Sequence, residues 1–388
     1  MQSFESGFIL AVIVAAIIVY APGYCSLRAV RTPREIALAA APLPTLFLYP
    51  LLGTAFATFS ASVEWYALFA GALVVVGLWC LICRIYFHRQ SGASKTICLL
   101  PAGRMPKRFP DIAFFALPAI VGVVLGWIVF SSNLYSFDAF CQEYDNAYHL
   151  SLIRTLTETG AWSPFSASIY AIPQDNGFNP FGDYAAFYPA SWHILCALTA
   201  CASNTEITVA VNAVNFLLSF IVYPAGVTLF LREVFFPAEK VALFGSVLSL
   251  CIVAFPWMYL GFGPLYPNLL GNALVYPTAF AFVVIWRHGA STFHRLFTAG
   301  LFASGLIAIA LAQPNGAFAL VILLAPFCVS QISARACELR SARKHPCIVG
   351  TLAGGVAFAV IAIIWLAFYN APFMHAVVSS SGPATLKI

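Results

Sequence analysis

The segment EYDNAYH, from Glu143 to His149, places two carboxylates and an imidazole in a chain that is otherwise strongly apolar. Asp145 and His149 lie four residues apart, so a helix that begins near Asp145 would bring both side chains to one face. A carboxylate held there can act as a general base and take the proton of an attacking hydroxyl. Glu143 could tune that carboxylate through its charge, or share a metal ion with it. The structural alternative is that Asp145 caps the helix and His149 bonds a backbone carbonyl.

The composition identifies the environment that must position these residues. Of 388 residues, 61% are hydrophobic and 9% are charged, whereas about a quarter are charged in a soluble domain. Lipid offers no hydrogen-bond partners to an open backbone, so membrane spans built from such a chain are helices. We expect an all-α polytopic membrane protein with about ten transmembrane helices. The expected spans are 7–26, 36–58, 66–84, 112–131, 206–231, 241–259, 268–286, 296–312, 315–332 and 348–369.

Basic residues between these spans predict the orientation. They follow the first, third, fifth, seventh and ninth spans, and of the 19 lysines and arginines only Arg154 and Lys387 fall elsewhere. These loops all lie on one face, which the positive-inside rule makes the cytoplasmic face. We therefore expect a multi-pass protein of the plasma (inner) membrane with its N-terminus outside. The net charge of +5 follows from this arrangement and does not indicate nucleic-acid binding.

One large segment, about residues 132–205, then remains on the outer face. It contains six of the 14 acidic residues but a single basic one, Arg154. Long structured loops are where membrane enzymes keep their chemistry. The first predicted helix of this segment has Asp145 as N-cap or first-turn residue and stops at Gly160.

Two helices are expected in this outer segment. On the first, Arg154 and Thr155 fall on the polar arc, whereas Asp145 and His149 fall on the apolar arc. We therefore expect the latter pair to face the membrane surface or the body of the protein. The second is the apolar stretch 187–203. Counting it as a span would reverse every later loop, so we expect an interfacial or re-entrant helix on the outer face.

These features resemble the GT-C class of membrane glycosyltransferases, which includes protein O-mannosyltransferases, aminoarabinose transferases and arabinofuranosyltransferases. EYDNAYH is similar to the acidic, histidine-containing motif of their first large outer loop, and FYPASWH, from Phe187 to His193, lies where they carry a second proline- and histidine-containing motif. The likeness extends to bacterial multi-pass proteins of unassigned function with the same two segments. It covers roughly residues 112–260 and implies a GT-C-like core, 112–388, preceded by a three-helix module, 1–111.

The resemblance implies partners and residue roles. The donor would be a sugar on a polyprenyl phosphate, the acceptor a glycan, lipid or protein of the cell envelope, and Asp145 the base, with Glu143 and Asp138 as rival carboxylates. His149 would orient the base or bind the acceptor. Substrate-binding residues would be Asp138, Arg154, Tyr188, His193, Asn268 and Asn315.

Several readings stay open for these residues. His193 could instead be an interfacial anchor beside Trp192, and Asn268 and Asn315 could belong to tight turns.

No cysteine or histidine spacing resembles a metal site. Because only Arg154 offers a cation in the outer segment, Mg²⁺ or Mn²⁺ held by the acidic residues, or helix N-termini, would have to compensate a lipid phosphate.

The second function class is a polytopic transporter or flippase of lipid-linked glycans. Transporters usually place ionisable residues or broken helices near the middle of the bilayer. No expected span has an acidic or basic residue near its centre, although Pro256 and Pro277 could break helices. The sequence therefore favours the transferase and keeps the transporter as the alternative.

Overall fold

The computed structural model describes residues 2–89, 111–167, 187–236, 238–261, 263–288 and 292–341, and these residues form helices joined by turns. Within these described ranges, eight helices are long and apolar enough to cross a membrane. The expected polytopic all-α architecture is thus confirmed in its class. The eight spans are Glu5–Ala29, Trp65–His88, Phe114–Asn133, Ile207–Val234, Lys240–Gly261, Tyr266–Arg287, His294–Ala312 and Asn315–Ala334.

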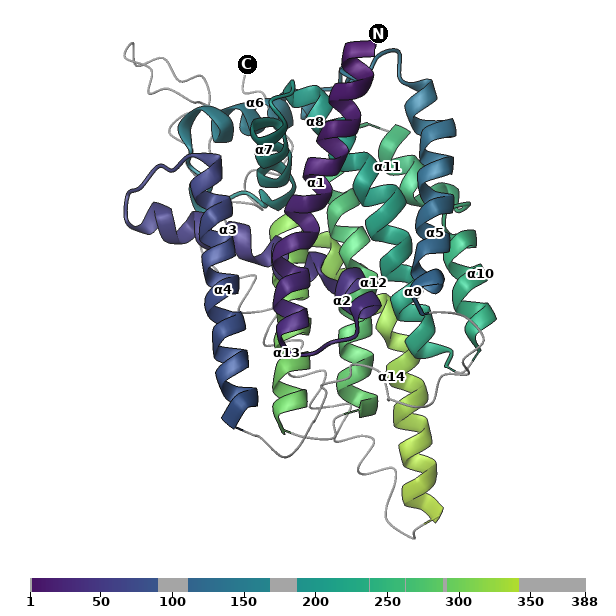
Figure 1. The fold of residues 1–388 in the computed structure, drawn as a ribbon. Helices are drawn as coiled ribbons and strands as arrows, with labels where there is room; N and C mark the ends of the chain where they lie inside the picture. Colours follow the sequence, from purple (N-terminus) through teal and green to yellow (C-terminus); the bar gives the residue numbers. More distant parts are fainter. Residues whose placement is uncertain are drawn as a thin grey trace, which may run out of the picture. The chain divides into compact units, whose positions relative to one another are not determined.

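These spans correspond to the following helices (Figure 1). Four of the spans lie within single α-helices: α1 (Gln2–Ala29), α4 (Trp65–Arg89), α12 (Tyr266–His288) and α13 (Thr292–Ala312). Three are composite: α5 (Asp111–Leu125) with η1 (Gly126–Phe130) and η2 (Ser131–Asn133); α8 (Ile207–Leu217) with η4 (Leu218–Val222) and α9 (Tyr223–Val234); and α10 (Glu239–Ser249) with η5 (Val253–Trp257) and α11 (Met258–Gly261). The last begins α14 (Asn315–Ser341).

The expected span 36–58 is a bent pair, α2 (Arg34–Ala40) and α3 (Pro42–Thr58), with an angle of 44° between them. The bend falls where Pro42 begins α3, since a proline ring cannot continue the hydrogen bonding of a preceding helix. The backbone N–H of Gly23 on α1 donates to Oγ1 of Thr45 at 2.8 Å, and a Cβ at Gly23 would lie 2.0 Å from the Ala41 carbonyl oxygen. Close packing of α1 therefore holds the bend. The tenth expected span, 348–369, lies outside the described residues.

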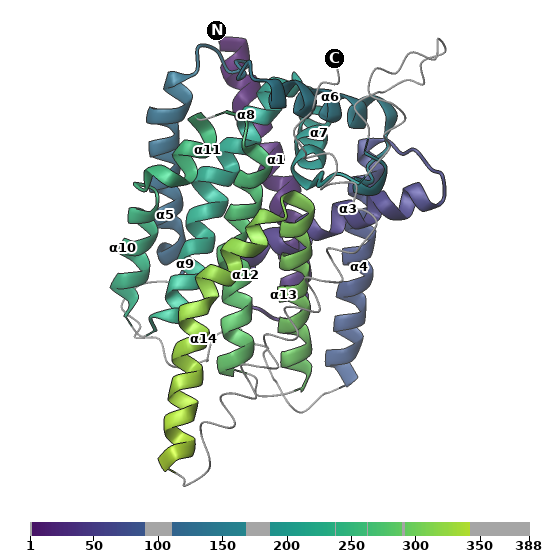
Figure 2. The ribbon, with the colours of Figure 1, turned by 180° about the vertical axis from the view of Figure 1, so that it is seen from behind.

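The helices on both sides of residue 111 belong to one compact unit, Met1–Tyr184 with Tyr188–Leu320. Within it α1 packs against α3, α4, α7 and α8, and α3 packs against α13. On the far flank α5, α9 and α10 lie together (Figure 2). The first three spans are thus integrated with the later ones in structure, and their origin as an added module stays a prediction. In its described part the second unit contains Phe187 and the continuation of α14 from Val321.

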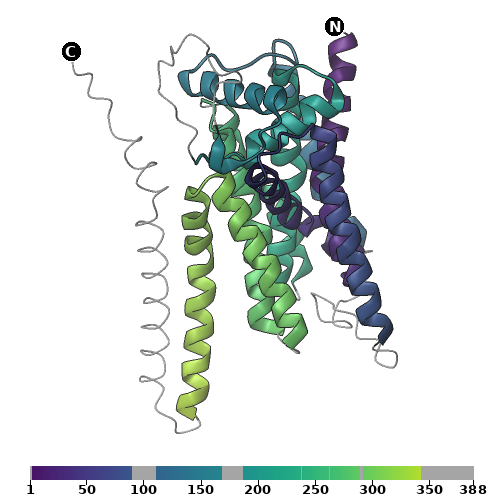
Figure 3. The same cartoon turned by 90° about the vertical axis from the view of Figure 1, so that its left-hand side faces the viewer.

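Two short helices occupy the end of this first unit where α1 begins. They are α6 (Tyr144–Thr159) and α7 (Ser191–Ser203), and α6 lies across the long helices (Figures 1 and 3). α7 packs against α1, α6 and α8, and eleven of its residues, including Trp192 and His193, are buried. An interfacial helix would keep a polar face exposed. The burial of α7 therefore does not fit an interfacial helix, and the re-entrant placement stays a prediction.

Helix ends rich in basic residues gather at the opposite end of the unit. Val30 after α1, Cys83 and Phe87 of α4, and Phe297 of α13 form one apolar cluster. Arg287 at the end of α12 donates to the backbone carbonyls of Glu233 and Val234 at the end of α9. The structure therefore places the ends of α1 and α4 beside the start of α13, and the end of α12 beside the end of α9, while the membrane side they occupy stays a prediction.

Candidate functional site

α6 begins at the acidic segment, and of the two positions expected for Asp145 it occupies the first turn and not the N-cap. Glu143 occupies the N-cap position and Asp145 lies in the first turn, and no side chain caps the helix. Asp145 and Glu143 are exposed. The favourable interaction of Asp145 with the helix dipole remains. Capping by a side-chain hydrogen bond, the structural alternative for Asp145, therefore has no support in the geometry.

The helix ends at Gly160 as expected, in the left-handed conformation with φ +65°. Leu152, Ile153 and Leu156 are fully or almost fully buried. Thr155 was expected on the wet arc but is buried, with its hydroxyl donating to the carbonyl of Ser151 at 3.0 Å. The buried face of α6 is therefore wider than its hydrophobic pattern indicates.

The structure joins the two motifs through their histidines. Nδ1 of His149 on α6 lies 2.8 Å from Nε2 of His193 on α7, and both rings are buried. Their centroids are 4.9 Å apart at an interplanar angle of 49°. Asp145, one turn before His149, is close enough for its charge to act on the His149 ring. The exposed carboxylate of Asp145 therefore lies at the start of α6, and the buried histidine pair follows one turn later.

Aromatic side chains surround the pair. Tyr188 lies 5.4 Å from His193 and 4.8 Å from Tyr148, measured between ring centroids. The centroid of the Trp192 ring lies 5.7 Å from that of His149 and 5.5 Å from that of Tyr266 on α12. These rings give the histidine pair a largely aromatic surrounding.

Two asparagines on α8 form hydrogen bonds to the site: one to Trp192 on α7, and one to the segment that precedes α6. Asn215 Oδ1 accepts a hydrogen bond of 3.1 Å from the indole N–H of Trp192. Asn212, three residues earlier and thus on the same helix face, donates to the backbone carbonyls of Phe137 and Ala139 at 3.0 and 2.7 Å. Sequence reasoning missed them, although two amides in the apolar stretch VAVNAVNF are a visible signal.

Burial controls the charge of the histidine pair. Burial lowers the pKa of His149 to about 4, against the opposing effects of the Asp145 charge and of a hydrogen bond with the backbone of Pro264. Burial, followed by the proximity of His149, lowers the pKa of His193 well below its usual value. Both imidazoles are therefore neutral at pH 7, and one ring donates to the other.

The hydrogen-bond network assigns the tautomers. The hydrogen bond between His149 and the backbone of Pro264 raises the pKa of His149. A bond with this effect favours the protonated ring, so the ring is the donor and the Pro264 carbonyl the acceptor. With that proton on Nε2, Nδ1 of His149 accepts the proton on Nε2 of His193. Nδ1 of His193 is then a buried acceptor, and within the described part of the chain no donor reaches it. An unpartnered acceptor such as Nδ1 of His193 can accept a hydrogen bond from a hydroxyl group or a water molecule.

Burial also raises the pKa of Tyr148 to about 12, and it raises the pKa of Tyr188, with smaller contributions from the charges of Tyr148 and Asp145. Both phenols therefore stay protonated at neutral pH and can donate hydrogen bonds. The effect of Asp145 on both Tyr188 and His149 places the carboxylate beside both motifs.

The remaining predicted site residues are dispersed. Asp138 accepts a hydrogen bond from the Ser136 hydroxyl in the segment before α6. Arg154 is exposed and pairs with Glu158 at 2.6 Å on the solvent side of α6. Asn268 lies in the first turn of α12, where its backbone carbonyl accepts from Asn272, and Asn315 begins α14 and is exposed. Within the described residues, the hydrogen bonds and ion pairs of these four do not reach the histidine pair.

A metal ion is not supported by the donors that the structure describes. Among those residues no three of the types His, Cys, Asp and Glu come together. Asp175 and Asp183, the other acids of the expected outer segment, lie outside the described residues. The phosphate compensation expected from Mg²⁺ or Mn²⁺ therefore stays a prediction, and no chemical step below is assigned to a metal.

Comparison with known proteins identifies a family. The family described as "Family of unknown function (DUF6541)" matches residues 16–383, so the chain belongs to it. The match runs across residue 111 and includes both motifs. Comparison with the curated proteins and with the solved structures gives no match.

Proposed function

For a member of a family of unknown function the activity has to be argued from the site, and we propose that this protein is a GT-C-type membrane glycosyltransferase. It transfers a sugar from a polyprenyl-phosphate donor to a cell-envelope acceptor on the outer face of the membrane. The observation that carries the proposal is the contact of His149 with His193, which unites the two motifs of the GT-C resemblance beside Asp145.

The proposed reaction is a single displacement. The acceptor hydroxyl oxygen attacks the anomeric carbon while the bond from that carbon to the phosphate oxygen breaks. The hydroxyl proton passes to the carboxylate of Asp145, and polyprenyl phosphate leaves with the bonding electron pair. A phosphate is already a good leaving group, so one carboxylate base is enough. The product has the inverted anomeric configuration.

The environment of Asp145 suits this role. The carboxylate is exposed to an incoming hydroxyl, whereas its neighbour His149 is buried and neutral. Tyr188, whose phenol stays protonated, supplies a hydrogen-bond donor for a sugar hydroxyl. In this proposal the histidine pair positions α6 against α7, so that Asp145 stays aligned with the bound substrates.

A surface-glycan profile tests the proposal. The gene is deleted and then restored as the native protein, as Asp145→Asn, or as Glu158→Gln, at matched levels in the membrane. Glu158 is the control because it lies on the same helix, is exposed and pairs with Arg154 on the solvent side. We expect deletion to remove a glycan that the native protein and Glu158→Gln restore and that Asp145→Asn does not.

One observation favours the second candidate, a transporter or flippase of lipid-linked glycans. The span Lys240–Gly261 is broken at Phe255, which has extended backbone angles of φ −152° and ψ 131°. Broken helices are common in transporters. Full restoration of the glycan by Asp145→Asn would favour transport over transfer, because moving the lipid across the membrane needs no base.

A further inference from the structure

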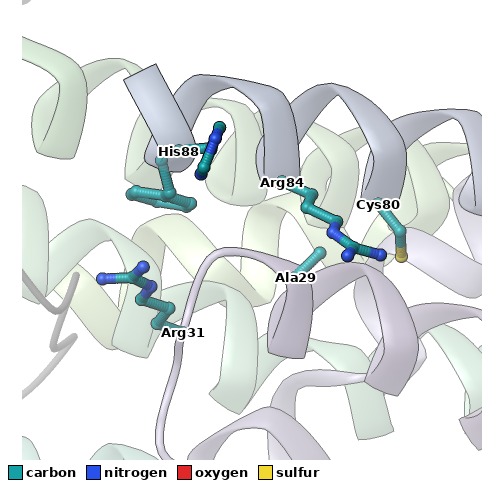
Figure 4. Close-up of a pocket in the computed structure, with 6 residues that line it drawn as sticks. Ala29, Arg31, Cys80, Arg84 and His88 are labelled. Carbon is teal, nitrogen blue, oxygen red and sulfur yellow. The ribbon is translucent and has the colours of Figure 1, made fainter. Parts of the chain in front are cut away.

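A second polar feature lies at the opposite end of the first unit from α6 and α7, where α1 and α4 end. It is an open cavity of about 460 Å³ lined by Ala29, Arg31, Cys80, Arg84, Phe87 and His88. Figure 4 shows Arg31 on the segment that follows α1, with Arg84 and His88 on α4. Three of the six lining residues are basic types and none is acidic, so the cavity attracts anions.

The two arginines are available to an anion. Arg31 and Arg84 are exposed, and neither forms an ion pair with a carboxylate within the described ranges. The guanidinium carbon of Arg31 lies 4.5 Å from the centroid of the Phe87 ring. Stacking on an aromatic face fixes a guanidinium while leaving its N–H edge free for a phosphate. The neighbouring Arg28 differs, since its guanidinium donates to the Thr32 carbonyl.

The backbone at Arg31 is held in an unusual conformation. Its φ is +62°, in the left-handed region that non-glycine residues rarely adopt. A glycine would adopt this conformation without strain. Strained residues are often retained where their side chains have a function, so the presence of arginine here is consistent with a role for its charge.

The surroundings point to a lipid as the source of the anion. α4 is a candidate membrane span, and Leu78, Leu81, Ile82 and Ile85, in the turns next to the cavity, are exposed on its surface. Such side chains face acyl chains in a membrane. A molecule whose phosphate enters the cavity can therefore lay its hydrocarbon along α4, which a free phosphate cannot do.

We propose that this cavity binds the phosphate head group of an anionic phospholipid from the membrane leaflet at this end of the protein. Arg31 and Arg84 bind the phosphate oxygens, His88 adds an imidazole donor, and the exposed face of α4 holds the acyl chains. The site is independent of the glycosyltransferase proposal, because it lies at the other end of the unit and uses none of its residues.

Thermal unfolding of the full-length purified protein in a neutral detergent tests this site. Dioleoyl phosphatidylglycerol, dioleoyl phosphatidylcholine or inorganic phosphate is added over a concentration series, and the stabilisation gives an apparent affinity. We expect stabilisation by phosphatidylglycerol only. A charge near a lipid surface contributes about 1 kcal/mol, so Arg84→Gln should weaken the apparent affinity about fivefold.

The variant Arg31→Gly distinguishes the loss of the arginine charge from a loss of folding stability. It removes the guanidinium but suits the positive φ, so the variant should be at least as stable as the native protein without lipid and still lose affinity for phosphatidylglycerol about fivefold. Arg34→Gln is the control, because Arg34 is exposed at the same end but does not line the cavity. Equal weakening by Arg34→Gln, equal stabilisation by phosphatidylcholine, or stabilisation by inorganic phosphate alone would each overturn the proposal.

Discussion

Nδ1 of His149 lies 2.8 Å from Nε2 of His193, although 44 residues separate them in the chain. The contact joins α6, which lies across the end of the first unit, to α7, which is buried within it. It follows that the orientation of the exposed carboxylate Asp145 depends on a buried polar contact one turn further along its own helix.

The first prediction concerns this contact. Removing either ring leaves one buried nitrogen of the other ring without its partner, at a cost of about 1–3 kcal/mol. We expect His149→Ala and His193→Ala each to destabilise the protein, and the double variant to be destabilised by about 1 kcal/mol less than the sum. Unfolding of the four proteins in the same detergent measures this coupling. Strict additivity would show that the two rings do not depend on each other.

The second prediction concerns pH. The pKa of His149 is about 4 in the folded protein, below its ordinary value of 6.5. Between these values the unfolded chain binds more protons than the folded one, so the free energy of unfolding falls as the pH drops from 6.5 towards 4. The slope for this one group is at most about 1.4 kcal/mol per pH unit. Above pH 6.5 the group contributes its full stabilisation.

Melting temperatures at pH 7, 6 and 5 measure this slope. His193 contributes in the same direction, because its pKa is also lowered by burial. The double variant His149→Gln, His193→Gln removes both groups and should flatten the profile over this range. An unchanged pH dependence in that variant would assign the effect to other groups.

The third prediction ranks the carboxylates of the proposed transferase. Loss of a general base typically lowers a rate by about 10²–10⁴-fold. We expect Asp145→Asn to have this effect on the return of the missing glycan after induced expression. Glu143→Gln and Asp138→Asn should slow it by less than about tenfold, because Glu143 only occupies the N-cap position and Asp138 bonds Ser136. A larger loss with Glu143→Gln would transfer the base role to Glu143.

The fourth prediction concerns the glycine that ends α6. Gly160 has φ +65°, and a Cβ there would lie 2.4 Å from the carbonyl oxygen of Val63. Gly160→Ala therefore combines backbone strain, about 1–2 kcal/mol, with a steric clash. It should also disturb Val63, whose carbonyl accepts from the Trp162 indole at 2.7 Å.

Two matched glycines separate these contributions. Gly263 has a similar φ of +71° but open space around it, and Gly77 lies inside α4 with open space as well. Melting temperatures should fall in the order Gly77→Ala, Gly263→Ala, Gly160→Ala, with Gly77→Ala stabilised by up to about 1 kcal/mol. If Gly160→Ala and Gly263→Ala lost the same stability, the contact with Val63 would be unimportant.

The positions of most helices can be predicted from the sequence alone. Apolar runs long enough to cross a bilayer form helices because lipid leaves the backbone no other partners, and nine of the expected spans agree with described helices when α2 and α3 are counted as one bent span. The sequence also predicts the end of α6, because a glycine at position 160 readily adopts the left-handed conformation. The gathering of basic helix ends follows from the alternation of spans and charged loops.

The contacts between these helices, in contrast, follow only from how the helices pack in three dimensions. The hydrophobic pattern of α7 fits a surface helix as well as an inserted one, and packing against α1, α6 and α8 made it buried. The same packing brought His193 to His149 and placed Asn212 and Asn215 behind the site. Sequence periodicity reports which face of one helix is apolar, whereas a contact between residues 44 positions apart depends on how separate helices pack, and no local pattern contains that information.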